Sequence, residues 1–72
     1  MVRNRIKVLR AEAGISATAL SERMPDGVDK VAMSFIEGGR VLPTRDGLDA
    51  MCEFFDCSPT DLYEKRELDT LP

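Results

Sequence analysis

The sequence predicts a compact all-α domain of five helices, on three observations. The chain has 72 residues, which is room for one domain with one modest core. Residues that break helices fall near position 14, over 25–27, at 38–39, at 43 and over 56–59, so they divide the chain into short pieces. Within each piece, apolar residues recur at three and four positions rather than alternating, which is typical of helices. Helices this short are stable only when they pack on one another.

Three helices are expected first, over residues 3–13, 17–24 and 30–37. Ser16 and Asp29 are suitable N-caps for the second and third, because their side-chain oxygens accept from free N–H groups of the first turn. Glycines follow the first and third helices and favour their ends there. The residues expected to face the core are Ile6, Leu9 and Ala13, then Leu20 and Met24, then Met33 and Ile36.

Two further helices are expected after Pro43. Thr44 is the N-cap of the fourth, which presents an apolar stripe at i, i+3, i+4 and i+7 formed by Leu48, Met51, Cys52 and Phe55. Ser58 and Pro59 open the fifth as N-cap and first helical residue, with Asp61 in the first turn, where the helix dipole favours a negative charge. Leu62 and Tyr63 are expected to close the core.

Composition indicates one globular domain over residues 2–66 and a short C-terminal tail, residues 67–72, that is expected to fray because it has little to bury. Hydrophobic residues make up 43% of the chain and charged residues 32%, as in ordinary globular proteins. No apolar run approaches the roughly 18 residues of a membrane span, and the basic N-terminus lacks the apolar stretch of a signal peptide. We therefore expect a cytoplasmic protein without membrane association.

Residue types that perform catalysis or bind metals are scarce. The chain has no histidine, and no serine sits in a nucleophile elbow. Cys52 and Cys57 have no partner ligands for zinc, and a cytosolic disulfide is rare, so both are expected to be small buried apolar residues. We expect no enzyme activity, no metal, no cofactor and no small-molecule substrate.

Charge is distributed unevenly along the chain, whose net charge is −3. Before residue 46 there are eight basic and five acidic residues, and from residue 46 onward there are two basic and eight acidic ones. A basic N-terminal half with an acidic C-terminal half fits a protein that turns one face toward phosphate and another toward solvent or a partner.

A set of short motifs keeps one order and spacing across sixty residues. The motifs are Asn4-Arg5-Ile6-Lys7-x-Leu9-Arg10, Gly14-Ile15-Ser16 with Leu20, Ile36-Glu37-x-Gly39-Arg40, Pro43-Thr44, Leu48, and Ser58-x-x-Asp61-Leu62-Tyr63. In this order the sequence resembles the phage repressor/Cro type of helix-turn-helix domain. The resemblance implies a fold like that of lambda repressor, with the helix-turn-helix at the second and third helices. It also implies a phage or mobile-element regulator of transcription that binds a near-palindromic duplex-DNA operator as a homodimer.

The resemblance further implies roles for individual residues. The third helix is expected to enter the major groove and read bases with Lys30, Val31, Ser34 and Phe35; Lys30 suits guanine O6/N7, and Val31 suits a thymine methyl. Arg10 and Glu37 match positions that form a partly buried ion pair between the first and third helices. The residues expected to bind phosphate are Ala17 and Thr18 through their amides, with Gly39, Arg40 and Arg45. Phe54 is expected in the dimer seam.

The sequence also departs from the pattern of that family. The turn over residues 24–29 is about two residues longer than usual, and Ala17 stands where the family usually has Gln. The third helix carries Val31, Ala32 and Phe35 where polar residues are typical. Because an exposed apolar stripe is more often a protein-contact surface, an alternative remains open: a helix-turn-helix module repurposed to bind a protein partner, of antitoxin or anti-repressor type.

Overall fold

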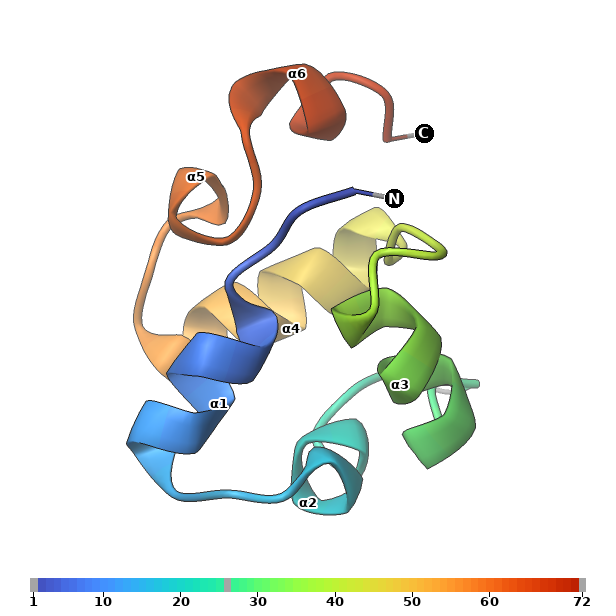
Figure 1. The fold of residues 1–72 in the computed structure, drawn as a ribbon, viewed down its shortest axis with the longest axis vertical. Helices are drawn as coiled ribbons and strands as arrows, with labels where there is room; N and C mark the ends of the chain where they lie inside the picture. Colours follow the sequence, from blue (N-terminus) through green and yellow to red (C-terminus); the bar gives the residue numbers. More distant parts are fainter. Residues whose placement is uncertain (1, 26, 72) are drawn as a thin grey trace.

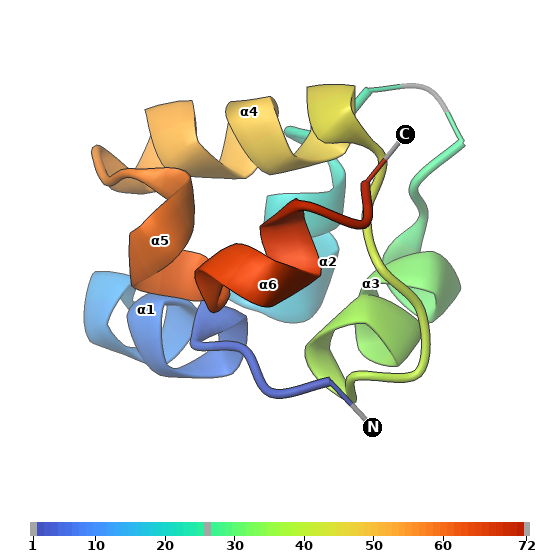
Figure 2. The same cartoon turned by 90° about the horizontal axis from the view of Figure 1, so that it is seen from above.

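The computed structural model describes residues 2–25 and 27–71, which form six α-helices and no strand. The helices are α1 (Ile6–Ala13), α2 (Ala17–Ser21), α3 (Lys30–Glu37), α4 (Arg45–Phe55), α5 (Pro59–Leu62) and α6 (Lys65–Leu68). In Figure 1, α1, α2 and α3 lie in front of α4, with α5 and α6 at one end. Figure 2 shows α4 along one side of the molecule and α1 and α3 along the other. The described residues are therefore all-α, but with a sixth helix where the sequence predicts five.

The N-caps lie where the sequence predicts them. In three helices the cap side chain accepts a hydrogen bond from an N–H of the first turn: Ser16 from Ala19 at 3.1 Å, Asp29 from Ala32 at 2.8 Å, and Thr44 from Gly47 at 3.0 Å. At α5 the N–H of Ser58 donates instead to the Asp61 carboxylate at 2.9 Å. Each bond satisfies an N–H group that has no partner inside its helix, so the caps decide where these helices begin.

The second helix is shorter than expected and ends at Ser21 rather than at residue 24. The N–H groups of Arg23 and Met24 donate to carbonyls three residues earlier, which makes a tightened turn instead of α-helix. Pro25 accounts for this end, because proline disfavours the helical conformation in the residue before it. The N–H of Val28 donates to the carbonyl of Pro25 at 3.3 Å and closes the expected turn, whose Asp26 lies outside the described residues.

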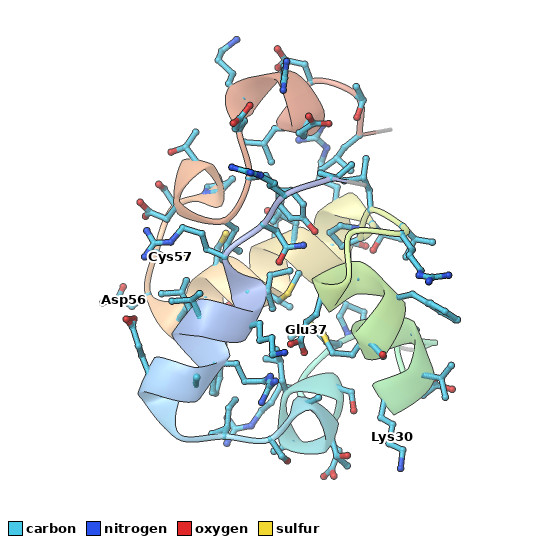
Figure 3. The ribbon with its side chains drawn as sticks, in the orientation of Figure 1. Lys30, Glu37, Asp56 and Cys57 are labelled. Carbon is cyan, nitrogen blue, oxygen red and sulfur yellow. The ribbon has the colours of Figure 1, made fainter. Side chains whose placement is uncertain are left out.

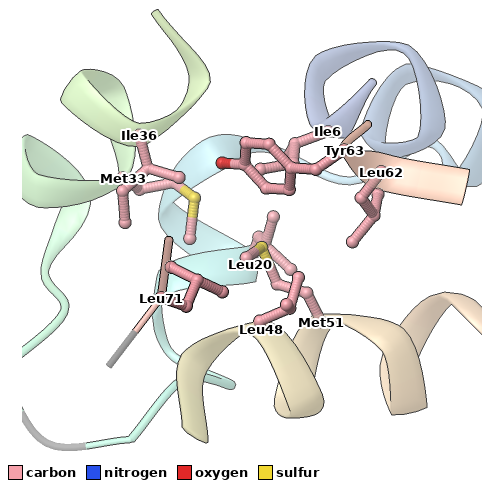
Figure 4. Packing of buried hydrophobic residues seen from close by; sticks show 9 residues of the cluster. All are labelled: Ile6, Leu20, Met33, Ile36, Leu48, Met51, Leu62, Tyr63 and Leu71. Atoms are coloured by element: carbon pink, nitrogen blue, oxygen red, sulfur yellow. The ribbon is translucent and has the colours of Figure 1, made fainter. Parts of the chain in front are cut away.

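The core is assembled from all parts of the chain (Figure 4). Its buried members are Ile6, Leu20, Met33, Ile36, Leu48, Met51, Leu62, Tyr63 and Leu71. Leu9, Met24, Cys52 and Phe55, which are also expected to face inward, pack against this cluster and are partly buried. Ala13 differs, because it is exposed at the last turn of α1. The predicted inward side chains are therefore fully buried in α3, whereas the predicted stripe of α4 is buried only in part.

The C-terminal segment packs against the core in this structure, where the sequence predicts a frayed tail. Residues 65–68 form α6, and Leu71 is 8% exposed and belongs to the core. In Figure 4, Leu71 lies between Met33 of α3 and Leu48 of α4. Arg45 Nη2 also donates to the carbonyl of Leu71 at 3.4 Å. Leu71 covers the core as a single apolar side chain. A periodic pattern of apolar residues within one helix does not predict such a contact, because it involves only one residue of the segment. Pro72 lies outside the described residues.

Candidate functional site

The outer face of α3 carries four side chains that point away from the core. Lys30, Val31, Ser34 and Phe35 are all exposed, whereas Met33 and Ile36 on the opposite face are buried. The exposed fractions of Val31 and Phe35 are 58% and 45%, which is high for large apolar side chains. Figure 3 shows Lys30 projecting from the first turn of the helix into solvent. All four residues predicted to read bases are therefore accessible on one helix face.

An ion pair between Arg10 and Glu37 holds α3 against α1. Arg10 Nε lies 3.2 and 3.3 Å from the two carboxylate oxygens of Glu37, and Nη2 lies 3.1 Å from Oε1. The remaining nitrogen, Nη1, donates to the carbonyl of Ile15 at 3.0 Å. The side chains are 18% and 9% exposed, and Glu37 points inward between α3 and α1 (Figure 3). The structure thus brings the two residues together, and the same guanidinium also ties down the segment that leads into α2.

A second link to α3, from Asn4, is not expected from the sequence analysis. Asn4 Nδ2 donates to the carbonyls of Ile36 and Glu37 at 3.0 and 3.4 Å, while Asn4 Oδ1 accepts from the N–H of Ile6 at 3.1 Å. One amide side chain therefore starts α1 and satisfies carbonyls at the end of α3, which have no partner inside the helix. The sequence signal for the first role is the Asn just before a helix; the second depends on the fold.

Gly39 has a packing role. Its φ of 77° places it in the left-handed region at the end of α3, and a Cβ there would collide with the backbone of Val2. Its N–H donates to the carbonyl of Ile36, and the following N–H, of Arg40, donates to that of Phe35. These two bonds form the usual glycine-centred end of a helix. Because Gly39 is buried and its N–H is already paired, the position predicted to bind phosphate has no free amide to offer.

A hollow of about 360 Å³ opens between α1, α2 and α3. It is lined by Lys7, Arg10, Ala17, Ser34, Glu37 and Gly38. Two of these were predicted to contact DNA, Ala17 through its amide and Ser34 through its side chain, and the fold brings them together. Ala17 and Thr18 open α2, where N–H groups have no carbonyl within the helix to pair with. Lys7 also lines this hollow but was not among the residues predicted to contact DNA. Its spacing of three from Arg10 could have indicated it, because that spacing places both residues on one face of α1.

Two arginines lie in the segment that follows α3. Arg40 is exposed directly after the helix end, and Arg45 is exposed at the start of α4. They differ in their surroundings, because the Arg45 guanidinium is engaged with the Leu71 carbonyl of the C-terminal segment. Two lysines lie closer to α3, since Lys30 is its first residue and Lys7 lines the same hollow as Ser34.

The packed pair of helices α2 and α3, joined by residues 22–29, is the centre of this arrangement. A family model described as a helix-turn-helix domain matches residues 3–64. The chain belongs to this helix-turn-helix family. The match spans α1 to α5 and leaves α6 outside, and it implies that the chain binds DNA. Searches of curated proteins and of solved structures gave no match.

Phe54 of this helix-turn-helix domain lies on α4 and is partly buried. Its ring packs edge-on against Phe55, with centroids 5.1 Å apart, and the Arg23 guanidinium lies 5.1 Å from the Phe54 centroid. A hollow of about 520 Å³ is lined by these two residues, Arg23 and Phe54, with Ala50 and Glu53. The residue predicted for the dimer seam is thus partly accessible and lines a surface hollow, while Phe55 and Arg23 contact its ring.

The two cysteines of the helix-turn-helix domain are free thiols, partly rather than fully buried. Burial, reinforced by the neighbouring Cys57 thiol, raises the pKa of Cys52 to about 11, and burial also raises the pKa of Cys57. Both therefore carry their proton at neutral pH. Within residues 2–25 and 27–71, no group of three His, Cys, Asp or Glu side chains is placed to hold a metal ion. No described helix is long and apolar enough to cross a membrane.

Proposed function

We propose that this protein is a sequence-specific transcriptional regulator of the phage repressor/Cro type, acting in the cytoplasm as a homodimer on a near-palindromic operator. The observation that carries the proposal is the outer face of α3, where Lys30, Val31, Ser34 and Phe35 are exposed on a helix held in place by the Arg10–Glu37 ion pair. A helix presented rigidly in this way suits the major groove of duplex DNA, which is wide enough to admit it.

In this proposal α3 reads bases and its surroundings hold phosphates. Lys30 is the candidate for hydrogen bonds to guanine O6 and N7, because it is the α3 residue with a charged donor on the exposed face. The proposed phosphate ligands are the amides of Ala17 and Thr18 and the side chains of Arg40, Arg45 and Lys7. Gly39 is left out of this set, since its amide already pairs with Ile36.

The test is fluorescence anisotropy of the purified protein with a random-sequence duplex pool at two salt concentrations, followed by sequencing of the bound fraction. We expect affinity to fall steeply with salt, because each phosphate contact releases counterions, with a slope of about −0.9 per contact in log K against log salt. We also expect an enriched near-palindrome with half-sites about one helical turn apart. A folded protein that binds no duplex at low salt would contradict the proposal.

Two alanine variants separate base reading from phosphate binding. Lys30→Ala is expected to change the enriched sequence at one position of each half-site, whereas Arg40→Ala is expected to weaken binding to all duplexes equally and to reduce the salt slope by about 1. Lys7→Ala should behave like Arg40→Ala. Indistinguishable sequence profiles for Lys30→Ala and Arg40→Ala would contradict this division of roles.

The homodimer is proposed through the region of α4 and α5, with Phe54 in the seam. Support comes from the partial exposure of Phe54 and from the hollow that it lines, which lies beside α4 rather than at the proposed DNA-reading helix. Sedimentation should show that Phe54→Ala shifts the protein toward monomer while circular dichroism stays helical. If the variant is as dimeric as the wild type, the seam lies elsewhere.

A second candidate function is the binding of a protein partner through α3. The exposure of Val31 and Phe35 favours it, because contiguous exposed apolar side chains often mark protein interfaces. In that case the wild-type protein would show no duplex affinity in the anisotropy experiment, which distinguishes this function from the first candidate. Val31→Ala and Phe35→Ala would then abolish binding to the protein partner.

A further inference from the structure

We propose that α3 selects duplexes that present thymine C5-methyl groups to Val31 and Phe35. The inference rests on the proposed function and specifies which chemistry of the base edges this helix reads. It assigns the main sequence preference to two apolar side chains rather than to hydrogen-bonding ones.

The first support is the position of the two side chains on α3. Val31 is 58% exposed and Phe35 is 45% exposed, and neither belongs to the apolar cluster that fills the core of the described residues. They are four residues apart, so they lie one above the other on the same helix face. Lys30 and Ser34 are their immediate neighbours in sequence and are also exposed. The face that a groove would meet is therefore half apolar.

The second support is the chemistry of the major groove. The thymine methyl is the apolar group among the base edges there, and the other edge groups are hydrogen-bond donors and acceptors. Val and Phe side chains have no donor or acceptor. If they covered a guanine, cytosine or adenine edge, its polar groups would lose water without gaining a partner, which is unfavourable. A thymine methyl instead gains apolar contact, so Val31 and Phe35 discriminate in favour of thymine.

Helix geometry also limits which thymines these residues reach. Four residues correspond to a rise of about 6 Å along an α-helix, and successive base pairs are about 3.4 Å apart. A helix lying along the groove therefore places Val31 and Phe35 over methyl groups about two base pairs apart. Lys30, next to Val31, is then placed to reach a neighbouring guanine.

The charges around the apolar pair favour duplex DNA over a protein as the occupant. Lys30 adjoins Val31, Arg40 follows the end of α3, and Lys7 lines the same hollow as Ser34. The acidic groups at the two ends of α3 are already engaged, Asp29 as its N-cap and Glu37 with Arg10. An apolar pair with basic side chains nearby complements a groove that is bordered by two phosphate backbones. Two side chains are also few for the core of a stable protein interface, which typically buries about 800 Å² on each partner.

The experiment removes single methyl groups from the best duplex recovered by selection. Each thymine is replaced in turn by deoxyuridine, which lacks only the methyl, and Kd is measured by anisotropy at constant salt. We expect two positions in each half-site, about two base pairs apart, where the replacement weakens binding about fourfold, the factor that corresponds to one buried methyl group. The complementary test uses a duplex in which those thymines have been changed to cytosine. Replacing each cytosine by 5-methylcytosine should tighten binding by about the same factor.

Protein variants then assign each methyl to its side chain. Val31→Ala is expected to abolish the uracil effect at one of the two positions and Phe35→Ala at the other. The reason is that removing the methyl has no further effect on Kd once the side chain that contacts it has been removed. Ser34→Ala is the matched control on the same face and should leave both uracil effects unchanged. Because all three side chains are exposed, thermal melting followed by circular dichroism should show that the variants stay folded.

Each remaining outcome overturns the inference in a recognisable way. Salt-dependent binding with no uracil effect at any position would leave the DNA-binding function standing and reject methyl reading. Uracil effects that persist in both alanine variants would reject Val31 and Phe35 as the readers. A folded protein without duplex affinity would reject the proposed function itself, and conversion of a dimer to monomer by Val31→Ala or Phe35→Ala would identify the face as a self-contact.

Discussion

Arg10 and Glu37 are 27 positions apart in sequence, yet two nitrogens of one guanidinium contact both oxygens of the carboxylate at 3.1–3.3 Å. The third nitrogen donates to the carbonyl of Ile15. One side chain therefore joins α1, the segment before α2 and the last turn of α3. Since the exposed face of α3 is the proposed reading surface, this pair determines how that surface is presented.

Breaking the pair is expected to destabilise the fold. Glu37→Ala should lower the free energy of unfolding by about 2–3 kcal/mol, because it leaves a mostly buried guanidinium with unpaired donors. The measurement is urea denaturation followed by circular dichroism. The control is Asp69→Ala, which removes an exposed ion pair: the side chains of Lys65 and Asp69 are 83% and 64% exposed. This substitution should lower the free energy of unfolding by less than about 0.5 kcal/mol. Equal effects of the two substitutions would contradict the structural role of Arg10 and Glu37.

Gly39 and Gly14 provide a matched pair of substitutions. Their φ angles are 77° and 72°, but a Cβ on Gly39 would meet the backbone of Val2, whereas a Cβ on Gly14 would meet nothing within 4 Å. Gly14→Ala should cost about 1 kcal/mol for the left-handed conformation alone. Gly39→Ala should cost at least about 2 kcal/mol, since the N-terminal segment must also move. If thermal or urea unfolding gives the same loss for both, Val2 is not held where the structure has it.

The protein is expected to be at least as stable when the hydroxyl of Tyr63 is removed. The side chain is 3% exposed, and within the described residues its hydroxyl has no hydrogen-bond partner. Tyr63→Phe should therefore leave the free energy of unfolding unchanged or raise it by up to about 1 kcal/mol at neutral pH. A clear loss of stability would show that the hydroxyl is paired.

The same residue predicts a pH dependence. Burial raises the pKa of Tyr63 from its ordinary value of 10 to about 12. Because the pKa is raised in the folded state, the contribution of the neutral Tyr63 to stability is retained below pH 10 and is lost as the pH rises from about 10 to about 12. In Tyr63→Phe this fall should be absent, while an earlier fall between about pH 9 and 11 should remain, because the pKa of Cys52 is raised to about 11. Urea unfolding across this pH range is the measurement.

Leu71 tests whether the C-terminal segment belongs to the fold. It is 8% exposed, so Leu71→Ala should cost about 2–3 kcal/mol by removing apolar contacts with the core. Val41→Ala is the control, because Val41 is 47% exposed and its truncation should change stability by less than about 0.5 kcal/mol. A Leu71→Ala variant as stable as the wild type would mean that the segment frays after all.

Local signals in the sequence predicted the elements of this protein well. Ser16, Asp29 and Thr44 cap the helices that follow them, because a cap depends on a side chain and an amide only three residues apart. The exposed face of α3 followed from apolar spacing, which is a property of one helix. The Arg10–Glu37 contact was expected from the resemblance to a known family, and the two opposite charges near helix ends agreed with it without identifying them as partners.

What the tertiary structure decided were the contacts between distant segments. Asn4 pairs with carbonyls at the end of α3, Gly39 lies beneath Val2, and Leu71 enters the core, and each contact joins residues that are far apart in the chain. Local patterns predict helices because hydrogen bonds within a helix and its caps span three or four residues. They do not predict which segment covers an open part of the core, because that depends on the shape left by all the other helices once they have packed.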